Sequence, residues 1–80
     1  MEYDKDKVDE MALALMYLGM FTDRSIWRAW KGFDWDVLDR LHEKGYISNP
    51  KSAAKSVVVE ESAVKLSEEL FKRHFGIANT

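Results

Sequence analysis

The stretch that most constrains the fold of this chain covers residues 33–59 and reads FDWDVLDRLHEKGYISNPKSAAKSVVV. Asp34 is a favourable N-cap, because its side chain can accept a hydrogen bond from the free backbone N–H groups of a first helical turn. Apolar residues then recur at helical spacing, with charged residues on the other side. Gly45 suits the left-handed position that ends many helices. The pattern therefore predicts one amphipathic helix over residues 34–44.

A β-hairpin is predicted directly after this helix. Residues 46–48 are short and strand-like, an Asn-Pro turn signal follows them, and residues 56–59 are a β-branched run with a strong preference for strands. We expect the two runs to pair, with residues 49–54 at the tip. No proline or glycine interrupts residues 61–75, so a closing helix is predicted there.

The order of helix, glycine, strand, basic loop, strand and closing helix resembles that of winged-helix domains. Residues 28–59 also resemble a family of short bacterial proteins known as a domain of unknown function. The resemblance implies one α+β, winged-helix-like domain over residues 1–80, with three helices, a two-stranded wing and a C-terminal helix. It implies no activity, substrate or ligand. One departure is Glu60, a weaker N-cap than the threonine that commonly opens the closing helix of such domains.

Length and composition limit the possible classes of protein. Eighty residues bury only a modest core, and the absence of cysteine excludes disulfides and thiolate zinc sites. No apolar run approaches the length of a membrane span, and the acidic N-terminus does not resemble a signal peptide. We therefore expect a cytoplasmic protein, and the family resemblance implies that it is bacterial. The net charge of −2 gives no general attraction to polyanions.

The first predicted helix follows a solvated, acidic lead-in over residues 1–10, and its segment over residues 11–18 is apolar nearly all round. We expect one of its two apolar stripes to face inward: Val8, Met11, Ala12, Leu15 and Leu18. The other stripe contains Leu13, Met16, Tyr17 and Met20. A surface helix of a small monomer normally shows one polar face. The second stripe is therefore covered either by other helices of the same chain or by a second copy.

The predicted closing helix is also broadly apolar. The first and last helices are adjacent in many winged-helix proteins and commonly make the dimer contact, so we expect a homodimer through these two helices. Its candidate interface residues are Leu13, Met16, Tyr17, Met20, Val64, Phe71 and Phe75.

A short helix is predicted over residues 25–30, with Ile26, Trp27 and Trp30 on its buried side. Tryptophans interleaved with Arg28 and Lys31 resemble a stacking platform for single-stranded nucleic acid. An aromatic cluster in so small a domain is more often its core, and we favour that interpretation.

Catalysis has little support in the sequence. The two histidines lie far apart and outside any metal-ligand spacing, and His42 fits a structural role beside an apolar stripe. Asp34 and Asp36 point in different directions on a helix. There is no glycine-rich phosphate loop and no nucleophile motif. We expect no enzyme activity, no cofactor and no metal site.

Nucleic-acid binding is the alternative that the fold suggests. The helix that would enter the major groove has four acids and two bases, and its Arg40 has Asp36 as a ready partner. Other bases could contact the phosphate backbone, but we favour ordinary solvated charge as their explanation. The candidates are Arg24, Arg28, Lys31, Arg40, Lys51 and Lys55. We predict a non-catalytic protein-interaction or regulatory module with an unknown protein partner, and a DNA-binding transcriptional regulator as the alternative.

Overall fold

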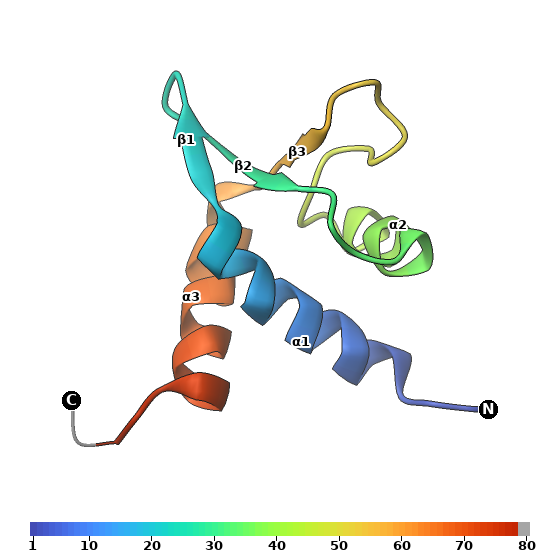
Figure 1. The fold of residues 1–80 in the computed structure, drawn as a ribbon, viewed down its shortest axis with the longest axis vertical. Coiled ribbons are helices and arrows are strands. Elements are labelled where there is room, and N and C mark those ends of the chain that lie inside the picture. The colour runs from blue at the N-terminus through green and yellow to red at the C-terminus, as the bar shows by residue number, and fades with distance from the viewer. Residues whose placement is uncertain (79–80) are drawn as a thin grey trace.

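The computed structural model describes residues 1–78, which form three α-helices, a short 3-10 helix and three β-strands (Figure 1). The predicted α+β class is therefore confirmed. In chain order the elements are α1 (Lys5–Met16), η1 (Tyr17–Gly19), β1 (Phe21–Asp23), β2 (Ile26–Trp30), α2 (Trp35–Glu43), β3 (Ser56–Val58) and α3 (Glu61–Phe75).

The three strands form one antiparallel sheet in the order β1-β2-β3. β1 and β2 are joined by a two-residue turn at Arg24 and Ser25, which have φ angles of 52° and 69°. Positive φ at both central residues is typical of the turn whose twist matches a tight hairpin. β3 pairs with β2 from the other side, with Ala29 opposite Val57.

The predicted helix over residues 25–30 is wrong, because this segment is strand β2. Isoleucine and tryptophan favour strands, a helix of six residues is marginal by itself, and β3 supplies a pairing edge. The burial differs accordingly, since Ile26 and Trp30 are 48% and 57% exposed whereas Ala29 is buried. The structure therefore lacks the second helix that we expected from the winged-helix resemblance.

The predicted helix over residues 34–44 is confirmed, whereas the predicted two-stranded wing is found only in part. Asp34 caps α2 by accepting a hydrogen bond from the backbone N–H of Asp36 at 3.1 Å, and Gly45 follows the helix with φ +82°. The first arm of the wing is reduced to a single bridge between Ile47 and Val59. The two arms of the predicted wing therefore meet at this bridge, but residues 46–48 form no strand and β3 pairs with β2.

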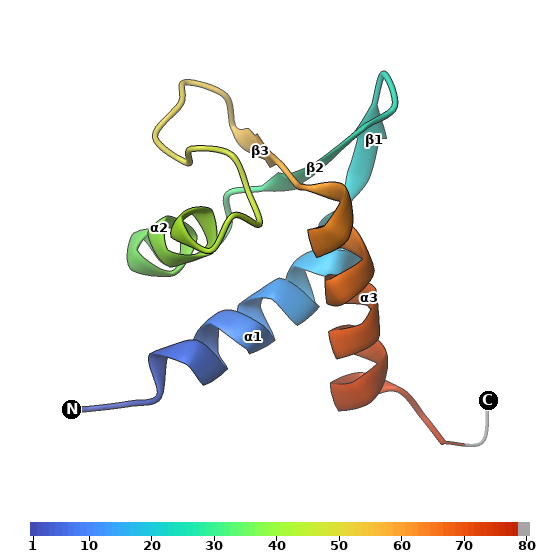
Figure 2. The ribbon, with the colours of Figure 1, turned by 180° about the vertical axis from the view of Figure 1, so that it is seen from behind.

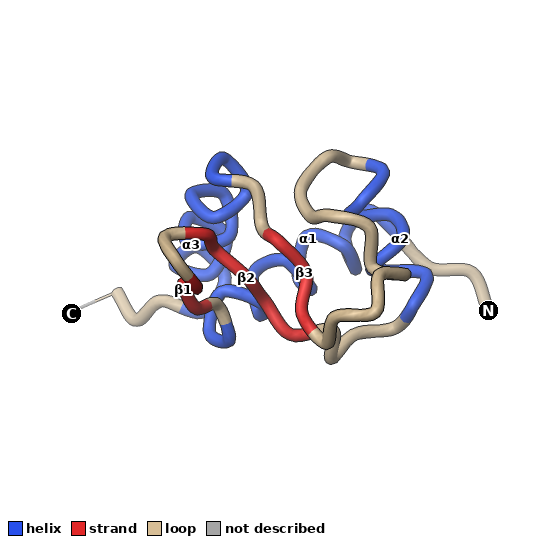
Figure 3. Tube along the Cα trace, turned by 90° about the horizontal axis from the view of Figure 1, so that it is seen from above, coloured by secondary structure: helices blue, strands red, loops and turns tan. Residues whose placement is uncertain are grey.

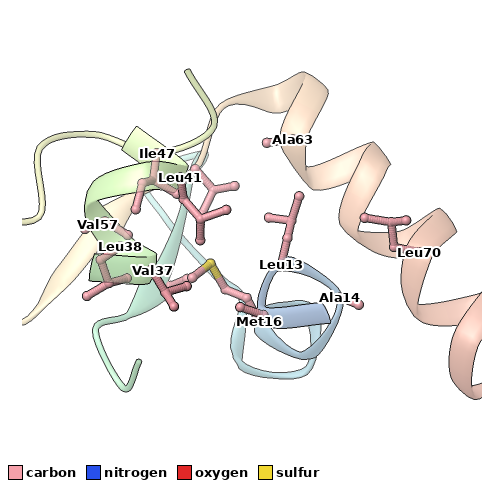
Figure 4. Packing of buried hydrophobic residues seen from close by; sticks show 13 residues of the cluster. Leu13, Ala14, Met16, Val37, Leu38, Leu41, Ile47, Val57, Ala63 and Leu70 are labelled. Atoms are coloured by element: carbon pink, nitrogen blue, oxygen red, sulfur yellow. The ribbon is translucent and has the colours of Figure 1, made fainter. Parts of the chain in front are cut away.

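The core lies between the three helices and the inner face of the sheet. Leu13 and Met16 point from α1 toward Leu38 and Leu41 of α2 (Figure 4). Leu70 extends from α3 on the other side of α1. The buried hydrophobic residues are Ala12, Leu13, Ala14, Met16, Ala29, Val37, Leu38, Leu41, Ile47, Val57, Val59, Ala63 and Leu70.

The two apolar stripes of α1 mostly have the opposite roles from those we predicted, although Ala12, which we expected inside, is buried. Leu15 and Leu18, expected inside, are 47% and 70% exposed, whereas Leu13 and Met16 are 1% and 2% exposed. The acidic lead-in is also wrong in part, because α1 already begins at Lys5 and Asp9 is buried within it. Asp9 lies on the same side of α1 as Leu13 because four residues complete about one helical turn.

The molecule is flat, with extents of 41 × 39 × 18 Å. α1 and α3 diverge from a common end near the strands (Figures 1 and 2). The turn between β1 and β2 and the loop before β3 both extend away from these two helices. From above, the sheet lies between α3 and α2 (Figure 3). No helix within residues 1–78 is long and apolar enough to cross a membrane.

Candidate functional site

A row of apolar side chains follows the outward side of α1. Val8, Met11, Leu15 and Leu18 recur at intervals of three and four residues, so they lie along one side of the helix and its 3-10 extension. Val8, Leu15 and Leu18 are exposed, and Met11 is half-buried. We call this row the α1 outer face. It has no polar residue along its length, which is unusual for a solvent-facing helix in a small protein.

A groove follows the α1 outer face where α1 meets the segment leading into α2. It has a volume of about 420 Å³, and Phe33 and Val37 form its opposite wall. Lys7 and Asp34 are the charged residues that line it. A smaller hollow of about 150 Å³ continues past Leu15 and Phe33 to Trp30. The α1 outer face is therefore one side of a continuous apolar surface.

The predicted dimer residues belong mainly to the contact between α1 and α3 within one chain. Leu13 and Met16 are buried in the core, which agrees with the alternative that helices of the same chain cover this stripe. Met20 and Val64 pack against that core. The ring of Phe71 lies 5.5 Å from that of Tyr17 and 5.2 Å from that of Phe75, measured between centroids. Of these three side chains only Phe75 is exposed.

A buried carboxylate joins α1 to α2. The side chain of Asp9 is 1% exposed and accepts hydrogen bonds from Arg40 Nε at 3.0 and 2.8 Å and from Lys44 Nζ at 2.9 Å. Lys44 Nζ also bonds Asp6 at 3.0 Å. The predicted pair of Arg40 with Asp36 is therefore wrong. Arg40 holds the core together and is not directed at a ligand.

The charge state of this cluster follows from its contacts. Burial acts to raise the pKa of Asp9, but the hydrogen bonds and charges of Arg40 and Lys44 outweigh it, so the pKa lies below its usual value. The hydrogen bond to Asp9 likewise raises the pKa of Lys44. All three groups are therefore charged at neutral pH, and their pairing gives the cluster a structural role.

A cavity of about 310 Å³ lies beside this cluster, between α1 and α3. It is lined by apolar side chains and by charged ones of both signs, including Glu10 and Arg73. Glu10 pairs with Lys7 at 3.1 Å and lies 3.4 Å from His74. Within residues 1–78 there is no group of three or more histidine, cysteine or acidic side chains that could hold a metal ion.

The structure brings most of the predicted basic residues together at one end of the sheet. Arg28 donates to the Oγ and carbonyl oxygen of Ser56 at 2.8 and 3.1 Å. Lys31 Nζ donates to the carbonyl oxygen of Ser52 at 2.7 Å, which places it on the loop that carries Lys51 and Lys55. Arg24 lies in the β1–β2 turn at the other end of β2, and Arg40 is in the core cluster.

Comparison with known proteins identifies the family. Residues 4–77 match the family described as a domain of unknown function (DUF6429). The chain belongs to this family. The DUF6429 chain is similar to an uncharacterized protein, y4hR, of the bacterium Sinorhizobium fredii, with 48% identity over 75 residues that cover 94% of this chain and 97% of that protein. No solved structure matches. The predicted family of short uncharacterised bacterial proteins is thus confirmed.

Sequence reasoning assigned the wrong role to the α1 outer face of this DUF6429 chain. It placed Val8, Leu15 and Leu18 inside because they recur at helical spacing, and it took Asp9, which is buried on the other side of the helix, for a solvated residue. A buried acid needs a cationic partner from elsewhere in the chain. Arg40 and Lys44, four residues apart on one side of α2, were the available signal.

Proposed function

We propose that this DUF6429 domain is a non-catalytic protein-interaction module that forms a homodimer through the α1 outer face. The main support is that Val8, Leu15 and Leu18 are exposed in a continuous apolar row, whereas Leu13 and Met16 of the other stripe are buried. Contiguous apolar surface beside a groove is typical of an interface. An 80-residue chain also gains more than a large one from burying such a surface.

A second copy is the partner that this surface fits best. A two-fold contact uses the same patch on both subunits, so the patch must complement itself. The groove has an uncharged centre, and the charged residues that line it are one cation, Lys7, and one anion, Asp34. A two-fold axis across the middle of the row would bring Lys7 of one copy toward Asp34 of the other. The absence of cysteine suits the reducing bacterial cytoplasm, where we place this module.

The experiment is the oligomeric state of the wild type and of Leu15→Glu, measured by sedimentation equilibrium. The substitution puts a charge in the middle of the α1 outer face without touching the core, so we expect a wild-type dimer and a folded monomeric variant. The control is Lys65→Glu, which adds the same side chain at an exposed position of α3 and should remain dimeric. A wild type that is monomeric at its highest soluble concentration contradicts the proposal.

A winged-helix regulator of duplex DNA is the second candidate, and it has less support. The part of the winged-helix pattern that persists is α2, the short bridge, β3 and α3. Arg40, the nucleic-acid candidate on α2, is bound to Asp9. The exposed charge of α2 includes Asp36 and Glu43, which would repel phosphate across a groove. The basic residues that remain lie on the sheet and its loop.

A further inference from the structure

Charge is divided unevenly between the sheet and the helices. The sheet with its two connecting segments, residues 21–31 and 48–59, contains five bases and a single acid, Asp23. These segments carry a net +4, although the whole chain carries −2. A basic region of this kind attracts a polyanion locally, whatever the sign of the whole protein.

Among the described residues, 1–78, the five bases have no carboxylate partner in an ion pair. Within residues 1–78 every ion pair lies in the helices or at their ends, and none involves a base of the sheet or its loops. Arg28 and Lys31 are held in place by neutral oxygens of Ser56 and Ser52. Their side chains are therefore positioned while their charge remains uncompensated. The five bases are Arg24, Arg28, Lys31, Lys51 and Lys55.

An aromatic surface accompanies these charges. Because side chains alternate along a strand, Arg28 and Trp30 lie on the outer face of the sheet, opposite the buried Ala29. Phe21 is the register partner of Arg28 and stacks on Trp30, with ring centroids 4.8 Å apart and planes inclined by 29°. Trp30 is 57% exposed, although we expected it in the core. The outer face thus presents an aromatic pair beside cationic side chains.

We infer that the outer face of the sheet binds single-stranded nucleic acid. A base stacks on the exposed part of Trp30, while Arg28 and Lys31 contact the adjoining phosphates. Lys51 and Lys55, on the loop to which Lys31 is bonded, extend the phosphate contacts beyond the sheet. Stacking on an aromatic side chain combined with a basic track is the usual means of binding single strands without sequence preference.

The geometry favours a single strand over a duplex. Bases in a duplex are stacked on one another, so an exposed tryptophan on a sheet has no free base to contact, whereas a single strand offers one. The described chain has no basic helix to enter a major groove, since α2 is acidic on its outside. β2 has five residues and is about 17 Å long, so one copy contacts a few nucleotides.

The test is fluorescence anisotropy with labelled oligo-dT and oligo-U of about 12 nucleotides, a length within the usual range of single-strand sites. A duplex of the same length is the competing ligand. We expect the wild-type protein to bind both single strands more tightly than the duplex at low salt, and to lose affinity steeply as salt rises. No binding of either single strand at low salt, or a preference for the duplex, overturns the inference.

Two pairs of variants locate the site. Trp30→Ala should weaken single-strand binding about tenfold, whereas Trp35→Ala should leave it unchanged. Trp35 is equally exposed at 58%, but it lies between Asp34 and Asp36 at the start of α2. An equal loss in both tryptophan variants overturns the inference.

The second pair does not depend on a sheet residue. Lys51→Glu combined with Lys55→Glu changes only the exposed loop, so it leaves the fold intact even if Trp30→Ala does not. We expect the double variant to lose most of its affinity at low salt. Lys5→Glu combined with Lys65→Glu makes the same change of net charge on exposed helical positions and should retain the affinity. Equal losses in the two double variants overturn the inference.

Discussion

The Nε–H of Arg40 on α2 is shared between both carboxylate oxygens of Asp9 on α1, at 3.0 Å from Oδ1 and 2.8 Å from Oδ2. Lys44, one turn after Arg40, donates a further hydrogen bond to the same carboxylate. This contact fixes the rotation of α1 about its axis, because Asp9 can be buried only where both cations reach it. The side that bears Leu13 and Met16 then faces the core, and the α1 outer face is left to solvent.

Replacing Asp9 should therefore destabilise the fold. Asp9→Asn removes the charge but keeps the size, and we expect the free energy of unfolding to fall by about 1–3 kcal/mol because hydrogen bonds to a charged group are lost in a buried place. Chemical denaturation measures the change. The control is Asp6→Asn, since Asp6 also bonds Lys44 but is 89% exposed, and it should change stability little. Equal effects at the two positions would refute the structural role of Asp9.

The same contact predicts an acid-sensitive stability. The pKa of Asp9 is lower in the folded chain than its usual value of 3.8, so this residue contributes stability that is complete above the unfolded pKa. The contribution is lost as pH falls through the folded pKa, that is, below about pH 4. Unfolding free energies measured from neutral pH downward should fall less steeply for Asp9→Asn than for the wild type. Parallel curves would contradict the assignment.

Two further variants test which of the two apolar stripes of α1 faces the core. Leu13→Ala leaves a cavity between α1 and the other helices and should cost about 2–5 kcal/mol. Leu15→Ala changes an exposed side chain and should cost about 0.5 kcal/mol or less. Both are measured by denaturation at low protein concentration, where dimer contacts do not contribute. A larger cost for Leu15→Ala would restore the orientation that we first predicted from the sequence.

The turn between β1 and β2 is a site for stabilisation. Arg24 and Ser25 both have positive φ, which neither residue adopts without strain. Asn and Gly at these positions suit the same turn, so the double replacement should raise the free energy of unfolding by about 1 kcal/mol. Thermal unfolding of the variant tests this. A loss of stability would show that the turn has a different geometry.

The helices whose ends are set by nearby residues could be predicted from the sequence. Asp34 and Gly45 set the limits of α2, and α3 extends over the whole predicted interval from Glu61 to Phe75. Each of these elements has its capping residue or its stop within a few positions of its end. Of the predicted wing, only the bridge between Ile47 and Val59 is present, and the pairing of β3 with β2 was not predicted.

The errors lie where distant residues decide the outcome. The segment around Trp27 and Trp30 becomes a strand because β3 pairs with it across about 30 residues of sequence. The inward side of α1 depends on Arg40, 31 positions after Asp9. Periodicity alone cannot show which of two apolar stripes on one helix faces the core. Here the buried stripe is the one that lies on the same side of α1 as Asp9.

The most direct test of the central claim, that the α1 outer face meets a second copy, uses the absence of native cysteine. Leu15→Cys places one thiol in the middle of the row, close to the proposed two-fold axis, and Lys65→Cys places one on an exposed position of α3. After mild oxidation, non-reducing mass measurement should show a disulfide-linked dimer for Leu15→Cys and mainly monomer for Lys65→Cys. Cross-linking that is absent at Leu15→Cys, or equal at the two positions, would contradict the claim.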